Sequence, residues 1–191
     1  YLLNSMNIDL KEITFIIVSF KAKQIIFNCI NSLPKLSKII VIENSYDQDL
    51  KKDLESKYDN IEVILNENSG MGASNNIGIK KTSTKYAFIL NPDVIFNKNT
   101  YLNLVEAVKK IDDFSIISPV EENKNFPNYE IKKKYSNISN NILEVDSVDG
   151  FSMLINKSKF DDEIYFDENF FLYLENTDLC LRQKNKNGKI Y

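Results

Sequence analysis

The sequence predicts an α/β fold with a mainly parallel central sheet and helices on both faces. Two observations support this fold class. Short apolar runs that suit strands alternate with helical patterns from residue 14 to residue 118. One of these runs, at 86–90, is apolar or aromatic throughout, which is typical of a strand buried on both faces. With 191 residues, of which 43% are hydrophobic, the chain fits one domain with a sizeable core.

The alternating elements follow one another closely along the chain. Strands are predicted at 14–20, 39–42, 61–65, 86–90 and 114–118, and helices at 22–33, 48–58, 71–81 and 100–111. Apolar residues recur at helical spacing within two of these helices, as in Leu50, Leu54 and Tyr58. Such stripes indicate helix faces that pack against the sheet.

The character of the sequence changes after Pro119. Residues 121–141 are polar and rich in Asn and Lys, which predicts a long excursion from the core. Order is expected to return at 145–155, and an aromatic stretch at 165–174 precedes a helical pattern at 177–186. The last residues resemble the opening of another strand, so the natural domain is expected to continue, and residues 1–12 are expected to be an extension without signal-peptide features.

Composition excludes several classes of function. A formal net charge of −3 and a pI near 5.2 give no global attraction to nucleic acid or to an anionic membrane. Histidine is absent, so Ser-His-Asp chemistry and imidazole metal sites are excluded within this sequence, and acid–base work falls to carboxylates. The two cysteines lie far apart in apolar segments, which favours buried thiols in a reducing cytoplasm.

Asp93 follows the apolar run at 86–90 directly after an Asn-Pro pair. Proline cannot donate to a sheet ladder, so the strand should end at this pair and Asp93 should project from a rigid corner. Ligands of open α/β sheets bind beyond the carboxyl ends of strands, and a carboxylate there is a natural metal ligand. The alternative is a simple Asn-Pro-Asp turn, and this fragment alone does not decide between them.

Two further polar segments stand where predicted strands end. Residues 68–78 are dense in glycine and asparagine and lead into a helix, which suits a ligand that carries phosphate or ribose. The segment is neither Gly-x-Gly-x-x-Gly nor a Walker loop. Glu43 and Asn44 follow the second strand and could hydrogen-bond a base or ribose, while Ser45 or Asp47 could also cap the next helix.

The order of six segments resembles family 2 glycosyltransferases, and most of all their rhamnosyltransferase branch. The segments are Ile17-Val18-Ser19-Phe20, Glu43-Asn44-Ser45, 68–78, Leu90-Asn91-Pro92-Asp93-Val94, Val148-Asp149-Gly150 and 166–182. The resemblance implies a GT-A domain over 13–191, with a nucleotide-sugar half at 13–119 and an acceptor half at 120–191. It implies inverting transfer of rhamnose or another hexose from a dTDP- or UDP-type donor to an acceptor hydroxyl, in surface polysaccharide synthesis.

The resemblance also assigns roles to individual residues. Asp93 matches the last acid of the family's metal-binding Asp-x-Asp motif, and Asn91 replaces the first, so weak Mg²⁺ or Mn²⁺ binding that depends on the donor diphosphate is expected. Gly150 and Phe151 resemble the segment that shapes the acceptor pocket. The positions expected to line the nucleotide-sugar are Ser19, Glu43, Asn44, Asn68, Gly70, Asn75, Asn76 and Asn91.

The sequence departs from the family pattern at Asn176. The family usually has Glu-Asp here, and the Asp is the expected base that removes the acceptor proton, which Asn176 cannot do. Glu175 and Asp178 remain as candidate bases, because burial could tune a carboxylate toward neutral pH. Glu175 is favoured slightly, since an acid at Asp178 is also explained by the dipole of the helix that starts there.

Two rival functions remain open. Asn91 and Asn176 are also consistent with a non-catalytic nucleotide-sugar or glycan-binding module. A nucleotidyltransferase is disfavoured, because Lys21-Ala22-Lys23 after the first strand lacks the usual glycine-rich loop. As partners, the resemblance implies a glycan or lipid-linked acceptor and no nucleic acid. The expected location is the cytoplasm, with peripheral association at the inner face of the membrane as one possibility.

Overall fold

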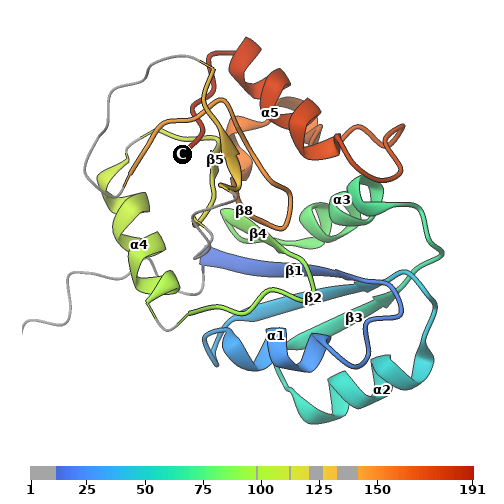
Figure 1. Ribbon diagram of the computed structural model, residues 1–191. Helices are drawn as coiled ribbons and strands as arrows, with labels where there is room; N and C mark the ends of the chain where they lie inside the picture. The colour runs from blue at the N-terminus through green and yellow to red at the C-terminus, as the bar shows by residue number, and fades with distance from the viewer. Residues whose placement is uncertain (1–11, 98, 112, 121–126, 133–141) are drawn as a thin grey trace, which may run out of the picture.

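The computed structural model describes residues 12–97, 99–111, 113–120, 127–132 and 142–191, which form an α/β layered fold (Figure 1). A central sheet has the strand order β3-β2-β1-β4-β8-β5. Strands β1 to β4 are parallel, whereas β8 runs antiparallel to both of its neighbours. The strands are β1 (Ile13–Ser19), β2 (Lys38–Glu43), β3 (Ile61–Leu65), β4 (Tyr86–Leu90), β5 (Ile116–Ile117) and β8 (Ser152–Asn156).

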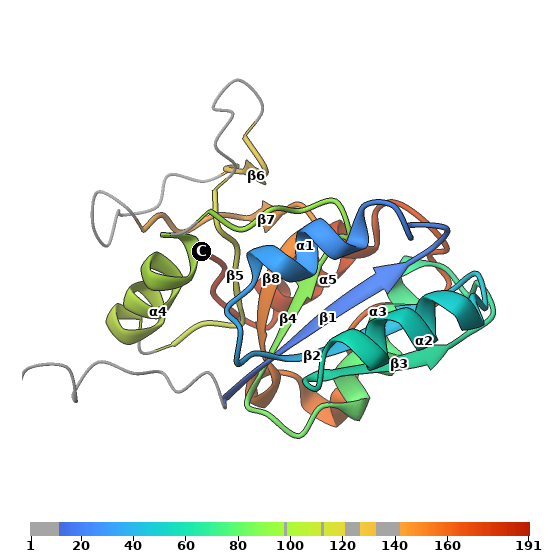
Figure 2. The ribbon, with the colours of Figure 1, turned by 90° about the horizontal axis from the view of Figure 1, so that it is seen from below.

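Helices cover both faces of this sheet, as the sequence predicts (Figures 1 and 2). Side chains of α1, α2 and α4 share a core with Phe15 and Ile17 of β1, while those of α3 and α5 share the opposite core with Ile16. This division follows from the alternation of side chains along a strand. The helices are α1 (Ile26–Ser32), α2 (Gln48–Lys57), α3 (Met71–Lys81), α4 (Thr100–Lys110) and α5 (Glu175–Asn185).

Smaller elements complete the described structure. Strands β6 (Tyr129–Glu130) and β7 (Ser147–Val148) form a two-stranded antiparallel sheet. Two short 3₁₀ helices, Lys157–Lys159 and Asp161–Glu163, follow β8. None of the helices within the described ranges is long and apolar enough to span a bilayer.

Several predicted boundaries are wrong. Order returns at 145–155 as expected, but the segment is divided between two sheets, because the chain turns at 150–151 between β7 and β8. Helix α1 begins at Ile26, after a turn over 22–25, and α5 begins at Glu175. Near the C-terminus, Ile190 forms isolated bridges to Ile116 and Val145, not a regular strand. Residues 1–11 of the expected extension and most of the 121–141 excursion lie outside the described residues.

Candidate functional site

Ser19 and Glu43 end neighbouring strands at the carboxyl edge of the sheet. They are partners in the parallel register of β1 and β2, and the Asn44 amide donates to the Ser19 carbonyl at 2.7 Å. The carboxyl ends of these strands point to one side of the molecule (Figure 2). This is the edge where open α/β sheets bind their ligands.

The Glu43 carboxylate is fully buried, and only one of its two oxygens accepts hydrogen bonds from the described residues. Its Oε1 accepts a hydrogen bond from the Ser45 amide at 2.8 Å and another from the Ser45 hydroxyl. Its Oε2 is buried without a hydrogen-bond partner among the described residues. A buried hydrogen-bond acceptor without a partner is energetically unfavourable. A ligand that donates a hydrogen bond to Glu43 Oε2 would remove this cost and bind favourably there.

Asn44 lies at the centre of a polar network between the ends of β2 and β3 and the start of α3. Its Nδ2 donates to Ser74 Oγ at 2.8 Å, and its Oδ1 accepts from Asn66 Nδ2 at 2.9 Å. Asn68 lies at the edge of this network, 3.5 Å from Asn44 Nδ2, and its Oδ1 accepts from the Gly70 amide. The Asn44 side chain therefore holds two loops together, while Asn68 remains exposed.

The Asn91–Val94 segment forms a turn immediately after β4. The Val94 amide donates to the Asn91 carbonyl at 3.2 Å, and the Asn91 amide donates to the Phe151 carbonyl at 2.9 Å. Asp93 is exposed at the corner of this turn, whereas Asn91 Oδ1 is buried with no partner in the described ranges. The segment is thus both a turn and a place where two oxygens are available, and it lies against the predicted acceptor residue Phe151.

Helix α1 is hydrogen-bonded to this turn and to the residues that follow it. Cys29 Sγ donates to the Asn91 carbonyl at 3.6 Å, and the Phe96 amide donates to Ser32 Oγ at 2.9 Å. Burial, together with the charge of the nearby Asp93 carboxylate, raises the pKa of the Cys29 thiol to about 12. Cys29 is therefore a protonated donor at neutral pH and not a reactive thiolate.

Gly70 begins α3 at a point of close backbone contact. Its φ of 89° lies in the left-handed region, and a Cβ built there would lie 2.3 Å from the Phe171 carbonyl oxygen. That same oxygen accepts from the Met71 amide at 3.0 Å. The start of α3 is thus fastened to the loop before α5, and the two lie side by side in Figure 1.

The two consecutive asparagines of α3 have different surroundings. Asn75 Oδ1 is buried without a partner in the described part of the chain. The Asn76 amide is engaged instead, since its Nδ2 donates to the Phe166 carbonyl at 2.9 Å and its Oδ1 accepts from the Phe166 amide at 3.0 Å. Only Asn75 of this pair therefore has an unsatisfied acceptor for a ligand.

Glu175 and Asp178 both lie in the first turn of α5. Helix-dipole stabilisation therefore applies to both, and the argument that separated them on the sequence is wrong. Their contacts separate them instead: Asp178 Oδ2 accepts from Arg182 Nε at 2.7 Å, whereas the 9%-exposed Glu175 has a buried Oε2 with no partner among the described residues. Glu175 is the carboxylate that is available for proton transfer.

Gly150 and Asn176 meet beside Glu175. A Cβ built on Gly150 would lie 3.3 Å from Asn176 Cβ, and Asn176 Nδ2 donates to the Val148 carbonyl at 2.8 Å. The Asn176 amide thus links α5 to the strand that precedes Gly150. The predicted acceptor segment at Gly150 and Phe151 lies between Asn176 on one side and Asn91 on the other.

Unpaired buried side-chain oxygens concentrate at the candidate site. Six such atoms occur in the part of the chain that the structure describes, and five of them belong to predicted site residues. The exception is Ser37, which precedes β2 at the opposite edge of the sheet. Native interiors leave few polar atoms unsatisfied, so this concentration indicates a place for a polar ligand. The five residues are Ser19, Glu43, Asn75, Asn91 and Glu175.

The oxygens near the β4 turn are chemically suitable for a hard divalent cation. Asp93 offers a carboxylate and Asn91 a neutral carbonyl oxygen, which are ligand types that Mg²⁺ and Mn²⁺ accept. No group of three or more Asp, Glu, Cys or His side chains with metal-site geometry occurs in the described ranges. A cation here would therefore take further ligands from a bound diphosphate.

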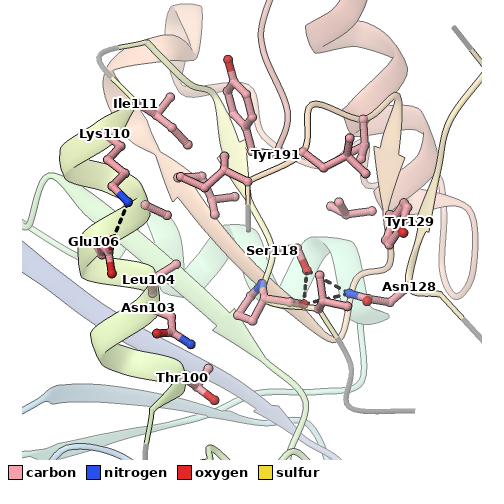
Figure 3. A pocket seen from close by; sticks show the side chains of 18 residues that line it. Thr100, Asn103, Leu104, Glu106, Lys110, Ile111, Ser118, Asn128, Tyr129 and Tyr191 are labelled. Carbon is pink, nitrogen blue, oxygen red and sulfur yellow. Dashed lines mark hydrogen bonds and ion pairs between the residues drawn. The ribbon is translucent and has the colours of Figure 1, made fainter. Parts of the chain in front are cut away.

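A separate cavity of about 620 Å³ lies between α4 and the segments on either side of β5 (Figure 3). Asn103 and Leu104 line one wall, and Ser118 and Asn128, which are hydrogen-bonded to each other, line another. None of the predicted site residues lines this cavity. It is therefore distinct from the candidate site at the strand ends.

Comparison with known proteins decides the family. The sequence profile described as "Glycosyl transferase family 2" matches residues 14–175. The chain belongs to this family. The low-salt glycan biosynthesis hexosyltransferase Agl10 of Haloferax volcanii is 26% identical over 200 residues, which cover 95% of this chain and 64% of that protein. Rhamnosyltransferase WbbL of Escherichia coli K12 is 29% identical over 176 residues, covering 76% of this chain and 65% of that protein.

Solved structures confirm the GT-A fold of this family 2 chain. The 1–349 portion of S. aureus TarS superposes with a TM-score of 0.70 at 16% identity, over 94% of this chain and 58% of that one. Mannosyltransferase PcManGT of Pyrobaculum calidifontis, in complex with GDP-Man and Mn²⁺, gives a TM-score of 0.69 at 9% identity, over 94% and 53%. The chain thus spans just under two thirds of the length of the two sequence relatives and somewhat more than half of these two solved chains.

Two residues important for the site were missed on the sequence. Ser74 joins the Asn44 network from α3, and Arg182 connects Asp178 to the Tyr165 carbonyl at 2.5 Å. The spacing of Asp178 and Arg182 by four residues in a helix is a recognisable ion-pair signal. Ser74 has no comparable local signal, because its partner lies 30 residues away.

Proposed function

We propose that this family 2 chain transfers a hexose, with rhamnose as one candidate, from a nucleoside-diphosphate sugar to an acceptor hydroxyl of a surface glycan, with inversion. The observation that supports this most is the set of five unpaired buried oxygens at the ends of β1, β2 and β4, in α3 and in the first turn of α5. Polar atoms from separate elements are unpaired together where this fold binds ligands.

The proposed reaction is a single displacement. The acceptor oxygen attacks the anomeric carbon, the bond from that carbon to the diphosphate oxygen breaks, and the diphosphate leaves with the electron pair. Glu175 Oε2 takes the acceptor proton as general base, a role for which its burial and lack of a partner suit it. Ser19, Glu43 and Asn75 are proposed to bind the donor, and Phe151 and Gly150 the acceptor.

A divalent cation would supply charge neutralisation at the leaving diphosphate. Asp93 and Asn91 are the residues proposed to hold it, on the grounds of their oxygen ligands and their place after β4. The backing from α1, through Cys29 and Ser32, keeps this turn in one position. Fixed ligands are favourable because they need not reorganise during the reaction.

The second candidate is a glycan- or nucleotide-sugar-binding module without activity. Asn176 favours it, since an amide that donates to Val148 stands where the family usually has the base. A transfer assay separates the two candidates: the chain is incubated with UDP-, dTDP- and GDP-sugars, a panel of glycan acceptors and Mn²⁺, and both the nucleoside diphosphate and the glycosylated product are measured. Nucleotide binding without release of diphosphate for any donor would support the module and contradict the proposed transfer.

A further inference from the structure

Asn76 makes an unusually complete set of contacts for a residue expected to bind the donor. It lies in α3, is 3% exposed, and exchanges two hydrogen bonds with the backbone of Phe166, at 2.9 and 3.0 Å. Its Nδ2 also donates to Glu168 Oε1 at 3.0 Å. Both N–H donors of the amide are therefore used within the protein, across 90 residues of sequence.

The residue that Asn76 holds lies beside the proposed base. Gly72 is one helical turn before Asn76, and a Cβ built on it would lie 3.2 Å from Phe166 Cβ and 3.5 Å from Glu175 Cβ. Phe166 and Glu175 therefore cover the same spot on α3. The segment that contains Phe166 and the start of α5 therefore both pack against α3 at Gly72.

Tyr165, the residue before Phe166, is hydrogen-bonded to helix α5. Arg182 Nη2 donates to the Tyr165 carbonyl at 2.5 Å while its Nε donates to Asp178 at 2.7 Å. Asp178 and Arg182 belong to α5, so the adjacent residues Tyr165 and Phe166 are bonded to α5 and α3 respectively. Both aromatic side chains are buried.

The segment between Phe166 and Glu175 has little regular structure to fix the start of α5. Four consecutive exposed apolar residues occupy 171–174, and both Tyr173 and Leu174 have positive φ angles, of 68° and 70°. Such backbone conformations are unfavourable for residues with a side chain and need support from their surroundings. The bonds to Tyr165 and Phe166 supply fixed points on which this segment and α5 can be supported.

From these contacts we infer that Asn76 is a positioning residue: it holds Phe166 so that Glu175 lies against α3, and Asp178 acts from α5 through Arg182 and Tyr165. Asn76 then binds no part of the donor, and Asp178 is not the base. The consequence for catalysis rests on the proposed function of Glu175, whereas the positional role does not. A misplacement of about 1 Å at a reacting group can lower a rate by about a hundredfold, so the effect on turnover should be large.

The inference is tested with Asn76→Ala and Asn76→Asp. The second variant keeps an acceptor for the Phe166 amide, removes both donated bonds and places a carboxylate beside Glu168 Oε1. Asp178→Asn, which leaves Asn76 in place, serves if both Asn76 variants fail to fold. Hydrogen exchange of the amides at 165–176 should become faster in both variants, while the affinity for UDP with Mn²⁺, measured by calorimetry, stays within about twofold. If the parent transfers sugar, kcat should fall by about ten- to a hundredfold with the donor KM nearly unchanged.

Asn156→Ala is the matched control. Asn156 is also a buried asparagine whose Nδ2 donates to a backbone carbonyl, that of Phe114 at 3.0 Å, but it lies at the end of β8, next to the start of β4 at the other edge of the sheet. Its substitution should lower the free energy of unfolding but leave hydrogen exchange of the amides at 165–176 unchanged. Its kcat should equal that of the parent. A second variant, Asp178→Asn, should also speed exchange at Tyr165 without weakening nucleotide binding.

Two results would overturn the inference. One is a loss of nucleotide affinity of about tenfold or more in Asn76→Asp with unchanged exchange at Phe166, which would make Asn76 a donor ligand. The other is unchanged exchange together with unchanged affinity, which would leave Asn76 without a positioning role. Because exchange is measured without substrates, failure of the proposed transfer activity would appear as an inactive parent and would be distinguishable from either result.

Discussion

Glu175 and Asp178 have the same chemistry and share one turn of α5, yet their contacts differ. Asp178 is ion-paired with Arg182 at 2.7 Å, with both side chains about a quarter to a third exposed. Glu175 is buried next to Gly72 with one oxygen unpaired in the described structure. The Arg182 guanidinium occupies Asp178 Oδ2, whereas no hydrogen bond within the described structure competes for Glu175 Oε2.

Glu175→Gln should therefore lower kcat by about 10²- to 10⁴-fold, which is the usual contribution of a general base, with little change in donor affinity. Single-turnover transfer and calorimetric nucleotide binding would be measured on the same preparation. Asp178→Asn is the comparison, and its kcat should remain well above that of Glu175→Gln. A rate for Glu175→Gln within a few-fold of the parent would make Asp178 the better candidate base.

Residue-level reasoning from sequence identified where polar atoms gather, but not which of them are satisfied. Ser19, Glu43 and Asn91 were predicted as site residues because each lies at the end of a recognisable strand or just after it. Asn44 carries the same signal and Asn76 lies in the glycine- and asparagine-rich segment at 68–78, yet their amides are used by partners 30 and 90 residues away. Hydrogen bonds of that sequence separation leave no local pattern, so the division between free and engaged amides needs the folded structure.

At the level of elements, the start of α3 depends on the absence of a side chain at Gly70. Gly70→Ala should destabilise the fold by ~1–3 kcal/mol, because alanine is unfavourable at a φ of 89° and its Cβ would meet the Phe171 carbonyl. For a chain of this size that corresponds to a melting temperature lower by roughly 2–12 °C. Differential scanning calorimetry would measure the change.

Gly150→Ala is the matched control for this prediction. Gly150 has no positive φ, and the nearest atom to its added Cβ is Asn176 Cβ at 3.3 Å, a contact far less close than the one at Gly70. The loss of stability should therefore be smaller than for Gly70→Ala. Equal losses at the two positions would mean that the left-handed conformation and the backbone contact at Gly70 carry little free energy.

The two cysteines lie on the buried faces of α1 and α5 and should respond to alkaline pH. Burial raises the pKa of Cys29 to about 12 and that of Cys180 to about 11, whereas their ordinary value is 9.0. Above about pH 9 the unfolded chain loses these protons while the folded chain keeps them, so the free energy of unfolding should fall as pH rises toward 11–12. Denaturant titrations at neutral and alkaline pH would measure this fall.

The matched comparison is the Cys29→Ala, Cys180→Ala double variant, because lysines and tyrosines also titrate in that range. The double variant should lose less stability between neutral and alkaline pH than the parent does. Both thiols of the parent should also react with a thiol reagent only after unfolding. An equal pH dependence in parent and variant would show that the thiols do not contribute to it.

Secondary-structure elements were predicted correctly where one hydrophobic pattern covers a whole segment. The prediction was less accurate where two strands follow each other closely along the chain. The strand at 86–90 matches β4 residue for residue, because its five apolar residues are all buried. For the stretch at 145–155 the sequence predicted ordered structure without assigning strands, and β8 joins the central sheet between β4 and β5 while β7 pairs with β6. Hydrophobic periodicity reports burial but does not report which sheet a strand joins.

At the scale of the whole molecule, the predicted donor and acceptor halves share one sheet and one site. Strand β8 comes from the second half and pairs with β4 of the first, and the Asn91 amide bonds to the Phe151 carbonyl across the same boundary. A ligand at the strand ends would therefore contact residues from both halves. Its binding should stabilise the molecule as a unit, since it favours the folded state by mass action.

Nucleoside diphosphates should raise the melting temperature of the chain, with a larger rise when Mn²⁺ is present. A ligand at about 100 times its Kd stabilises the folded state by ~2.7 kcal/mol, or about 5–10 °C for a domain of this size. UDP, dTDP and GDP would be compared with and without Mn²⁺ in a thermal-shift panel. The nucleoside diphosphate that gives the largest rise in melting temperature identifies the nucleobase of the donor.

Asp93→Asn separates the contribution of the cation from that of the nucleotide. In this variant the rise caused by the nucleotide alone should persist, because Ser19 and Glu43 are unchanged, whereas the additional rise with Mn²⁺ should disappear. Asp59→Asn, an exposed acid before β3 at the opposite edge of the sheet, is the control and should keep the full Mn²⁺ effect. An undiminished Mn²⁺ increment in Asp93→Asn would remove Asp93 from the proposed cation site, because the diphosphate would then be holding the ion without this carboxylate.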